Sequence, residues 1–168
     1  MKIRVEDKVS DEERRELFGW GEDIFVVEHL NLKWKPKDLH LFVDVDASPV
    51  THVGLLQHTI SVNERPVKVC GVGAVVTALK AHGKGYASHA MRYAKTLMCE
   101  EWGVDFGLLF CRDPLVPFYE RLGWQKLKEP VEIEQPSGAI PFPLNVMVLP
   151  CRTDEWPAGS VKLNGLPW

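Results

Sequence analysis

Residues 75–87 read VVTALKAHGKGYA, and this stretch decides how the rest of the chain is interpreted. An apolar segment leads into a basic loop, and the loop opens directly onto an amphipathic helix. Unpaired N–H groups at a helix N-terminus, together with the helix dipole, attract anions. Gly83 and Gly85 allow the backbone to come close to a ligand. Three further side chains can add positive charge: Lys80, His82 and Lys84. The stretch therefore predicts a cradle for a phosphate-bearing ligand.

This loop also has competing interpretations. A glycine-rich turn between a strand and a helix also occurs as a plain connector. The loop lacks the G-x-x-x-x-G-K-S/T pattern of a P-loop. It also lacks a full G-x-G-x-x-G followed by an acidic residue at the usual distance, so a dinucleotide site is poorly supported.

Length and composition place the chain in a broad class. Its 168 residues suit one domain over 1–168, with residues 150–168 as a C-terminal tail. The net charge of −3 argues against a large basic surface, so no nucleic-acid partner is expected. The N-terminus lacks the apolar region of a signal peptide, and no apolar run is long enough to span a bilayer. We therefore expect a cytoplasmic protein with no membrane partner.

The cysteines are expected to be structural rather than chemical. The four are Cys70, Cys99, Cys111 and Cys151. They form no C-x-x-C pair and no cluster with histidines at the spacing of a zinc site. They are interpreted as small apolar side chains of a reduced protein, and no metal is expected.

The first half of the chain predicts an antiparallel meander beside one helix. Ser10 and Glu13 form a capping box, and a helix is expected to follow to about residue 30, before a loop over 31–38. Gly71 and Gly73, inside a predicted strand, indicate a bulge or a close approach by another group. Strands are expected over residues 2–6, 39–46, 50–60 and 67–77.

The second half alternates strands and helices. The strongest periodic segment is 85–102, whose apolar residues form one helical stripe. A short helix over 117–122, an irregular proline-rich loop over 129–143, and strands over 106–110, 124–128 and 144–149 complete the expected elements. The fold class is α/β (α+β): a central mixed sheet, an antiparallel N-terminal meander, and helices on both faces.

Two motifs at a characteristic separation carry a family resemblance. Residues 82–87 read HGKGYA, and residues 118–124 read FYERLGW. Together they resemble the GNAT superfamily of N-acetyltransferases. Its acyl-CoA loop has Arg or Gln, two variable residues, Gly, one variable residue, then Gly or Ala. Gly85 and Ala87 match this pattern, and His82 stands at the Arg/Gln position. The later motif, F-Y-x-x-x-G-F/W, matches in full.

The resemblance implies a site and a mechanism. Acetyl-CoA, as co-substrate, would lie in a notch where the strand ending at Thr77 splays from the strand over 106–110. Tyr119 would protonate the departing CoA thiolate as general acid after direct attack by an amine. The pantetheine and the thioester carbonyl would be held by Val75, Val76 and Thr77. The diphosphate would be held by His82, Gly83, Lys84, Gly85, Tyr86, Ala87 and Ser88.

Several roles stay open. Tyr119 can also be interpreted as a core aromatic residue with a satisfied hydroxyl. No acid lies in 71–77, where many relatives carry a Glu, and an amine that arrives neutral needs no base. The candidate bases, each more often simply solvated or paired, are Asp44, Asp46, His52, His58 and Asp113.

The tail resembles that of aminoglycoside 2′-N-acetyltransferases, in residues 147–150 (MVLP), residues 156–161 (WPAGSV) and the final Trp168. The chain departs from their acidic pattern at Lys33, at Gly73 and over 140–144. A small-molecule amine is therefore the leading acceptor, with an aminoglycoside as the alternative. An enzyme with a longer acyl donor and a non-catalytic acyl-CoA sensor also stay open. Dimers are common in the superfamily, so a homodimer is among the partners that the resemblance suggests.

Overall fold

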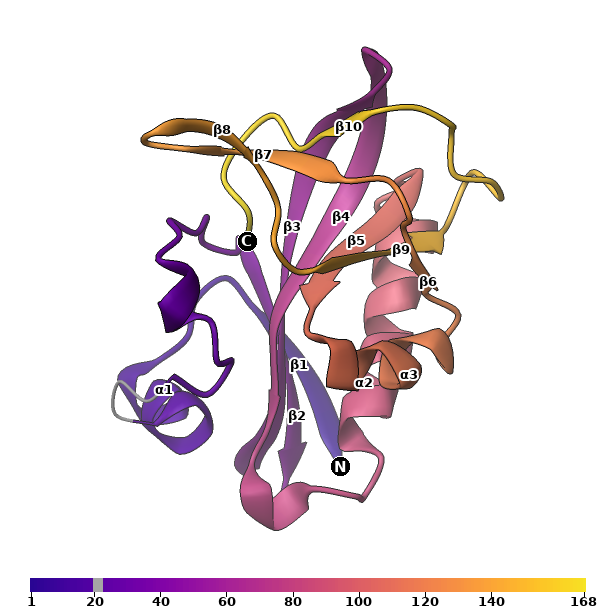
Figure 1. The fold of residues 1–168 in the computed structure, drawn as a ribbon. Coiled ribbons are helices and arrows are strands. Elements are labelled where there is room, and N and C mark those ends of the chain that lie inside the picture. The colour runs from indigo at the N-terminus through magenta and orange to yellow at the C-terminus, as the bar shows by residue number, and fades with distance from the viewer. Residues whose placement is uncertain (20–22) are drawn as a thin grey trace.

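The computed structural model describes residues 1–19 and 23–168. Within them, ten strands form one mixed sheet, and Figure 1 shows how the helices flank it. The strands are β1 (Lys2–Glu6), β2 (Leu39–Val45), β3 (Ser48–Val62), β4 (Arg65–Thr77), β5 (Phe106–Cys111), β6 (Gln125–Lys126), β7 (Val131–Gln135), β8 (Gly138–Pro141), β9 (Asn145–Pro150) and β10 (Val161–Lys162). The helices are α1 (Asp11–Phe18), α2 (Tyr86–Thr96) and α3 (Val116–Glu120), with short helical turns η1 (Glu28–Leu30), η2 (Leu79–Ala81), η3 (Leu97–Glu101) and η4 (Asp113–Leu115).

The sheet confirms the predicted fold class. Strands β1 to β4 form an antiparallel meander, β4 and β5 pair in parallel, and β5 and β9 pair antiparallel. Figure 1 shows α1 on one side of the central strands and α2 with α3 on the other. The meander positions the N-terminus of α2, because β4 carries the chain directly into the loop before that helix.

Helix α1 begins where the sequence predicts and ends earlier. The backbone N–H of Glu13 donates to Ser10 Oγ at 3.2 Å, and the Ser10 N–H donates to Glu13 Oε2 at 2.8 Å, which completes the capping box. The helix ends at Phe18 because Gly19 adopts φ 70°, so the expected extent to residue 30 is wrong. Residues 20–22 of that prediction lie outside the described residues.

Helix α2 follows the predicted stripe. Ala90, Met91 and Ala94 are buried against the sheet, and the π-helical turn η3 carries the helix on to Glu101 with Leu97 and Met98 buried. One apolar face against the meander therefore holds α2 and sets the direction of its N-terminus.

Two segments are more ordered than the sequence suggests. Residues 129–143 are not an irregular loop, because β7 and β8 pair as an antiparallel hairpin with Val131 and Ile133 buried. The tail contains β10, which joins β3 to β7, and ends with Trp168 only 3% exposed. The prolines within 129–143 are typical of a loop, so they obscure the alternation of apolar and polar residues along the hairpin. No helix in the described ranges is long and apolar enough to cross a membrane.

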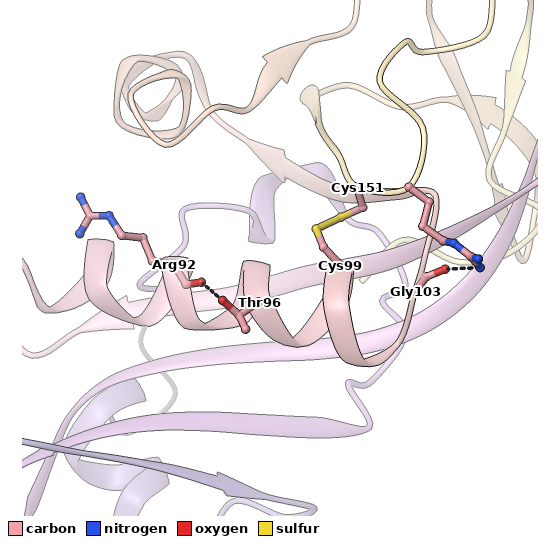
Figure 2. Close-up of a disulfide and its surroundings, with 6 residues drawn as sticks. Arg92, Thr96, Cys99, Gly103 and Cys151 are labelled. Atoms are coloured by element: carbon pink, nitrogen blue, oxygen red, sulfur yellow. Dashed lines mark hydrogen bonds between the residues drawn. A yellow bond between two sulfur atoms is a disulfide. The ribbon is translucent and has the colours of Figure 1, made fainter.

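The cysteine prediction is half wrong. Cys99 in η3 and Cys151 just after β9 form a disulfide across a sequence separation of 52 residues, shown in Figure 2 beside the end of the helix. Cys70 and Cys111 are free and buried, as expected of small apolar side chains. Spacing could not reveal the pairing, because the fold brings the two cysteines together. Because disulfides are rare in reducing compartments, the cysteines no longer support the expectation of a cytoplasmic protein.

Reduction of the disulfide is expected to destabilise the fold by about 2 kcal/mol, because the open chain regains loop entropy when it unfolds. The melting temperature should fall by roughly 4–8 °C in a thermal melt with a phosphine reductant. The Cys99→Ser/Cys151→Ser double variant should melt at the lower temperature with or without reductant. Equal melting temperatures of the oxidised and reduced wild-type protein would contradict this expectation.

Candidate functional site

A cavity opens where two parallel strands diverge. Strands β4 and β5 pair only from Val69 with Phe106 to Val72 with Leu109, whereas β4 continues to Thr77. The divergence is visible in Figure 1, and a cavity of about 790 Å³ lies at this place. The predicted splay between the strand ending at Thr77 and the strand over 106–110 is therefore present.

Most of the residues predicted for the site line this cavity. Tyr119 reaches it from α3, and Lys84 is the predicted residue that does not line it. The others come from the end of β4 and from the loop and first turn of α2: Val75, Val76, Thr77, His82, Gly83, Gly85, Tyr86, Ala87 and Ser88. The fold thus brings together two motifs that are more than 30 residues apart in the sequence.

The loop before α2 is open toward the cavity. Gly83 and Gly85 have φ of 73° and 79°, and a Cβ built at either would have no heavy atom within 4 Å. No side chain caps the first turn of α2. His82 Nε2 donates to the Thr77 carbonyl oxygen at 2.7 Å, which ties the loop to the end of β4. The open backbone and the uncapped helix N-terminus can receive an anionic ligand.

A bulge in β4 forms the wall of the cavity. The register with β3 shifts between His52 and Gly54, and Ala74 has a φ of 49°, which is unusual for a residue other than glycine. His52 Nδ1 donates to the Ala74 carbonyl oxygen at 2.7 Å, so its Nε2 accepts from His40 Nδ1 at 2.9 Å. The buried His52, hydrogen-bonded to the half-buried His40, therefore holds the bulge in place.

Tyr119 is buried with its ring against Phe118 and Trp124 and is 6% exposed. Burial, and then the nearby Cys111 thiol, raise the pKa of its hydroxyl well above the usual value, so the phenol keeps its proton. Among the described contacts, the hydroxyl makes no hydrogen bond, so it is available to a ligand in the cavity.

The five candidate bases do not line the cavity. Asp44 pairs with Arg4, Asp113 accepts from Asn145, and Asp46 lies exposed at the β2–β3 turn. His58 donates to the Leu163 carbonyl oxygen at 2.7 Å, and His52 is held at the bulge. In the part of the chain that is described, no group of His, Cys, Asp or Glu side chains is arranged to hold a metal ion.

Sequence patterns missed several residues that line the cavity. Lys37 and Trp34 come from the segment predicted only as a loop, Arg112 follows β5, and Trp168 comes from the end of the tail. A signal did exist, because Gly71 and Gly73 indicated a close approach. A Cβ at Gly71 would collide with the Trp168 indole, and one at Gly73 would lie 2.7 Å from Lys37 Cε.

Comparison with known proteins gives a consistent result. Residues 15–127 match the family described as acetyltransferase (GNAT) domain. No curated protein sequence matches the chain. Among solved structures, the fold is similar to the GNAT family N-acetyltransferase YhbS from Escherichia coli in complex with CoA, with TM-score 0.62, 17% identity and coverage of 99% of this chain and 94% of that one.

Three further structures share the fold. An acyl-CoA N-acyltransferase from Pseudomonas aeruginosa has TM-score 0.57 and 18% identity over 88% of this chain and 98% of that one. A GNAT family acetyltransferase from Brucella melitensis in complex with acetyl-CoA has TM-score 0.56 and 11% identity over 95% and 94%. In the N-acetyltransferase from Kribbella flavida, this chain spans 34% of the length and the identity is 19%, with TM-score 0.53.

Proposed function

Because this chain belongs to the GNAT acetyltransferase family, we propose that it transfers the acetyl group of acetyl-CoA to the amine of a small molecule. The observation that carries the proposal is the cavity between β4 and β5, which joins an open, uncapped helix N-terminus to a buried tyrosine hydroxyl. The structures in complex with CoA and with acetyl-CoA that share the fold support the same donor.

The residues of the cavity fit such a donor. The backbone at Gly83 and Gly85 and the first turn of α2 would bind the diphosphate, with His82 beside them. The end of β4, Val75–Thr77, would hold the pantetheine arm and the thioester carbonyl. His52 would keep the bulge at Ala74 in the shape that this contact requires.

The chemistry follows from this placement. The neutral amine of the acceptor attacks the thioester carbonyl, forming the C–N bond, and the C–S bond then breaks. Tyr119 donates its proton to the departing thiolate; its raised pKa means that the hydroxyl still holds this proton when the thiolate forms. The amine proton leaves through solvent in the cavity, because none of the five candidate bases lines it.

The aminoglycoside alternative gains no support from the cavity. A polycationic acceptor needs compensating negative charge. Among the described residues that line the cavity there is no Asp or Glu, whereas Lys37, His82 and Arg112 are present. The proposal is therefore limited to smaller amines.

Acetyl-CoA is expected to raise the melting temperature of the protein. At a concentration near a hundredfold over Kd the stabilisation is about 2.7 kcal/mol, or roughly 5–10 °C for a domain of this size. Gly85→Asp should abolish the shift, because it places a carboxylate where the diphosphate would lie.

The matched control is Gly103→Asp. Gly103 has a similar positive φ of 60° and leaves only ordinary contact with Arg152 at 3.6 Å, but it lies outside the cavity. The Gly103→Asp variant should melt at a lower temperature than the wild-type protein, and acetyl-CoA should still raise its melting temperature by the full amount. Loss of the shift in both variants, or its absence in the wild-type protein, would refute the assignment of the donor site.

A further inference from the structure

We propose that Lys37 binds an anionic group of the acceptor, so that the acceptor is an amine that also carries a carboxylate beside an apolar body. This inference rests on the proposed acetyl transfer and specifies the acceptor class for the same cavity. It is carried by the position of Lys37, by the absence of a partner for it among the described residues, and by the charge and polarity of the cavity walls.

The position of Lys37 is built into the sheet. Its side chain crosses two glycines on adjacent strands, Gly54 of β3 and Gly73 of β4, which are partners in the β3–β4 register. A Cβ at Gly54 would lie 2.6 Å from Lys37 Cγ, and one at Gly73 would lie 2.7 Å from Cε and 3.2 Å from Nζ. Any other residue at either position would displace the lysine, so the two glycines leave room for its side chain to cross the strands, and Lys37 is one of the residues that line the cavity.

The ammonium group has no partner in the described residues. The ion pairs found there all involve Arg4, and no hydrogen bond of Lys37 is present. The main-chain oxygen of Trp168 lies on the same side of Gly73, 3.3 Å from the same Cβ position, but it makes no hydrogen bond with Lys37. Burial lowers the pKa of Lys37 to about 8. At neutral pH the group is therefore still mostly charged, and an anion would compensate for its desolvation.

The charge of the cavity favours an anion. Three described residues that line it are basic, namely Lys37, His82 and Arg112, and none is acidic. His82 belongs to the loop before α2, which is occupied with the donor in the proposed function. Lys37 comes from the segment before β2 and approaches across β3 and β4, so it remains available to the acceptor.

Much of the remaining cavity wall is apolar. The apolar residues come from the segment after α1, from the segment before β2, from the turn before β9 and from the tail: Ile24, Phe25, Val27, Trp34, Leu144 and Trp168. A cavity in which Lys37 is accompanied by aromatic and aliphatic side chains matches a ligand with an anionic group and an apolar body. Amino acids with large apolar side chains combine both with the required amine.

The test compares acceptors that differ only in the carboxylate. The probes are phenylalanine, tryptophan and leucine, each paired with its amide, which keeps the amine and the side chain. We expect the wild-type enzyme to prefer at least one free acid over its amide in kcat/KM. Lys37→Met, which keeps the length but not the charge, should raise KM for that acid by about 10–100-fold and leave the amide nearly unchanged. Lys33→Met, exposed in the same segment and outside the cavity, is the matched control and should behave as the wild-type protein.

Two kinetic results would overturn the inference. A similar fall in kcat for acid and amide, with a changed pH profile, would make Lys37 a general base instead. Equal use of acids and amides by the wild-type enzyme would show that the acceptor class is wrong.

Binding separates this inference from the proposed function. Calorimetry with the CoA-loaded protein measures affinity for the same probes without turnover. One case is that acetyl-CoA stabilises the protein but neither acids nor amides are acetylated. Binding of an acid to the wild-type protein, with loss of that binding in Lys37→Met, then supports the anion site. If none of the acids binds, the anion site is refuted. If acetyl-CoA does not bind, the proposed function itself fails, and binding of the acids to the free protein decides the role of Lys37.

Discussion

Replacing Tyr119 by Phe is expected to lower kcat by about 10²–10⁴-fold while the Kd of acetyl-CoA stays nearly unchanged. The phenol is buried, keeps its proton because its pKa is raised, and faces the cavity with no hydrogen-bond partner among the described contacts. Removing one oxygen leaves the ring in contact with Phe118 and Trp124, so the packing survives. In the proposed mechanism, the thiolate then lacks its proton donor.

Steady-state kinetics with a free-thiol readout, together with the acetyl-CoA melt, would test this expectation. The matched control is Tyr93→Phe, on α2 but exposed and outside the cavity, which should leave both quantities unchanged. If kcat and acetyl-CoA affinity fell together, Tyr119 would be a structural residue. If kcat were unchanged, another group would protonate the thiolate. A non-catalytic sensor would show no turnover even as the wild-type protein.

Acidification is expected to remove about 3 kcal/mol of stability through His52 between pH 6.5 and pH 4. Burial lowers its pKa to about 4, with smaller contributions from His40 and Lys37, and the hydrogen bond to Ala74 partly opposes the shift. Because the folded pKa lies below the unfolded value, the unfolded chain takes up the proton first. The stabilisation is therefore complete above about pH 6.5 and is lost as the pH falls toward 4.

Urea denaturation at pH 7, 5.5 and 4 would measure this loss. His52→Leu should be less stable at pH 7 by about 1–3 kcal/mol, because the Ala74 carbonyl loses its donor, and should show a much smaller loss on acidification. His29→Gln, an exposed histidine of η1, should keep the wild-type slope. If the stability of His52→Leu fell with pH as steeply as that of the wild-type protein, other groups would cause the pH dependence. His40 would be the first of these to consider, because burial also lowers its pKa.

Features determined by neighbouring residues could be predicted from the sequence. The capping box at Ser10, the stripe on α2 and the alternation of the meander strands all depend on side chains a few positions apart. The glycine-rich loop before α2 also follows from local rules, since φ near 75° at two positions requires glycine. The roles of the individual site residues within 75–88 come instead from the family resemblance that this loop carries.

Features that depend on distant segments could not be predicted. Lys37 is an ordinary lysine until Gly54 and Gly73 are brought beside it by the β3–β4 register. Trp168 enters the cavity only because β10 returns the tail to β3 and β7. In the sequence, the glycines indicate that other groups come close to the strands, but they do not identify Lys37 and Trp168 as those groups.

The disulfide also bears on how related sequences can diverge. Cys99 and Cys151 close a covalent ring that contains β5, Tyr119 and the β7–β8 hairpin. The entropy of closing a ring grows only slowly with its length, about 0.6 kcal/mol for each doubling. Insertions and deletions in the exposed turn between β7 and β8 would therefore change the stability little, while Leu144, which follows β8, lies on the cavity wall. In the proposed function, sequence changes in this turn could therefore reshape the wall of the cavity near Leu144 while the loop before α2, which lies outside the ring, stays the same.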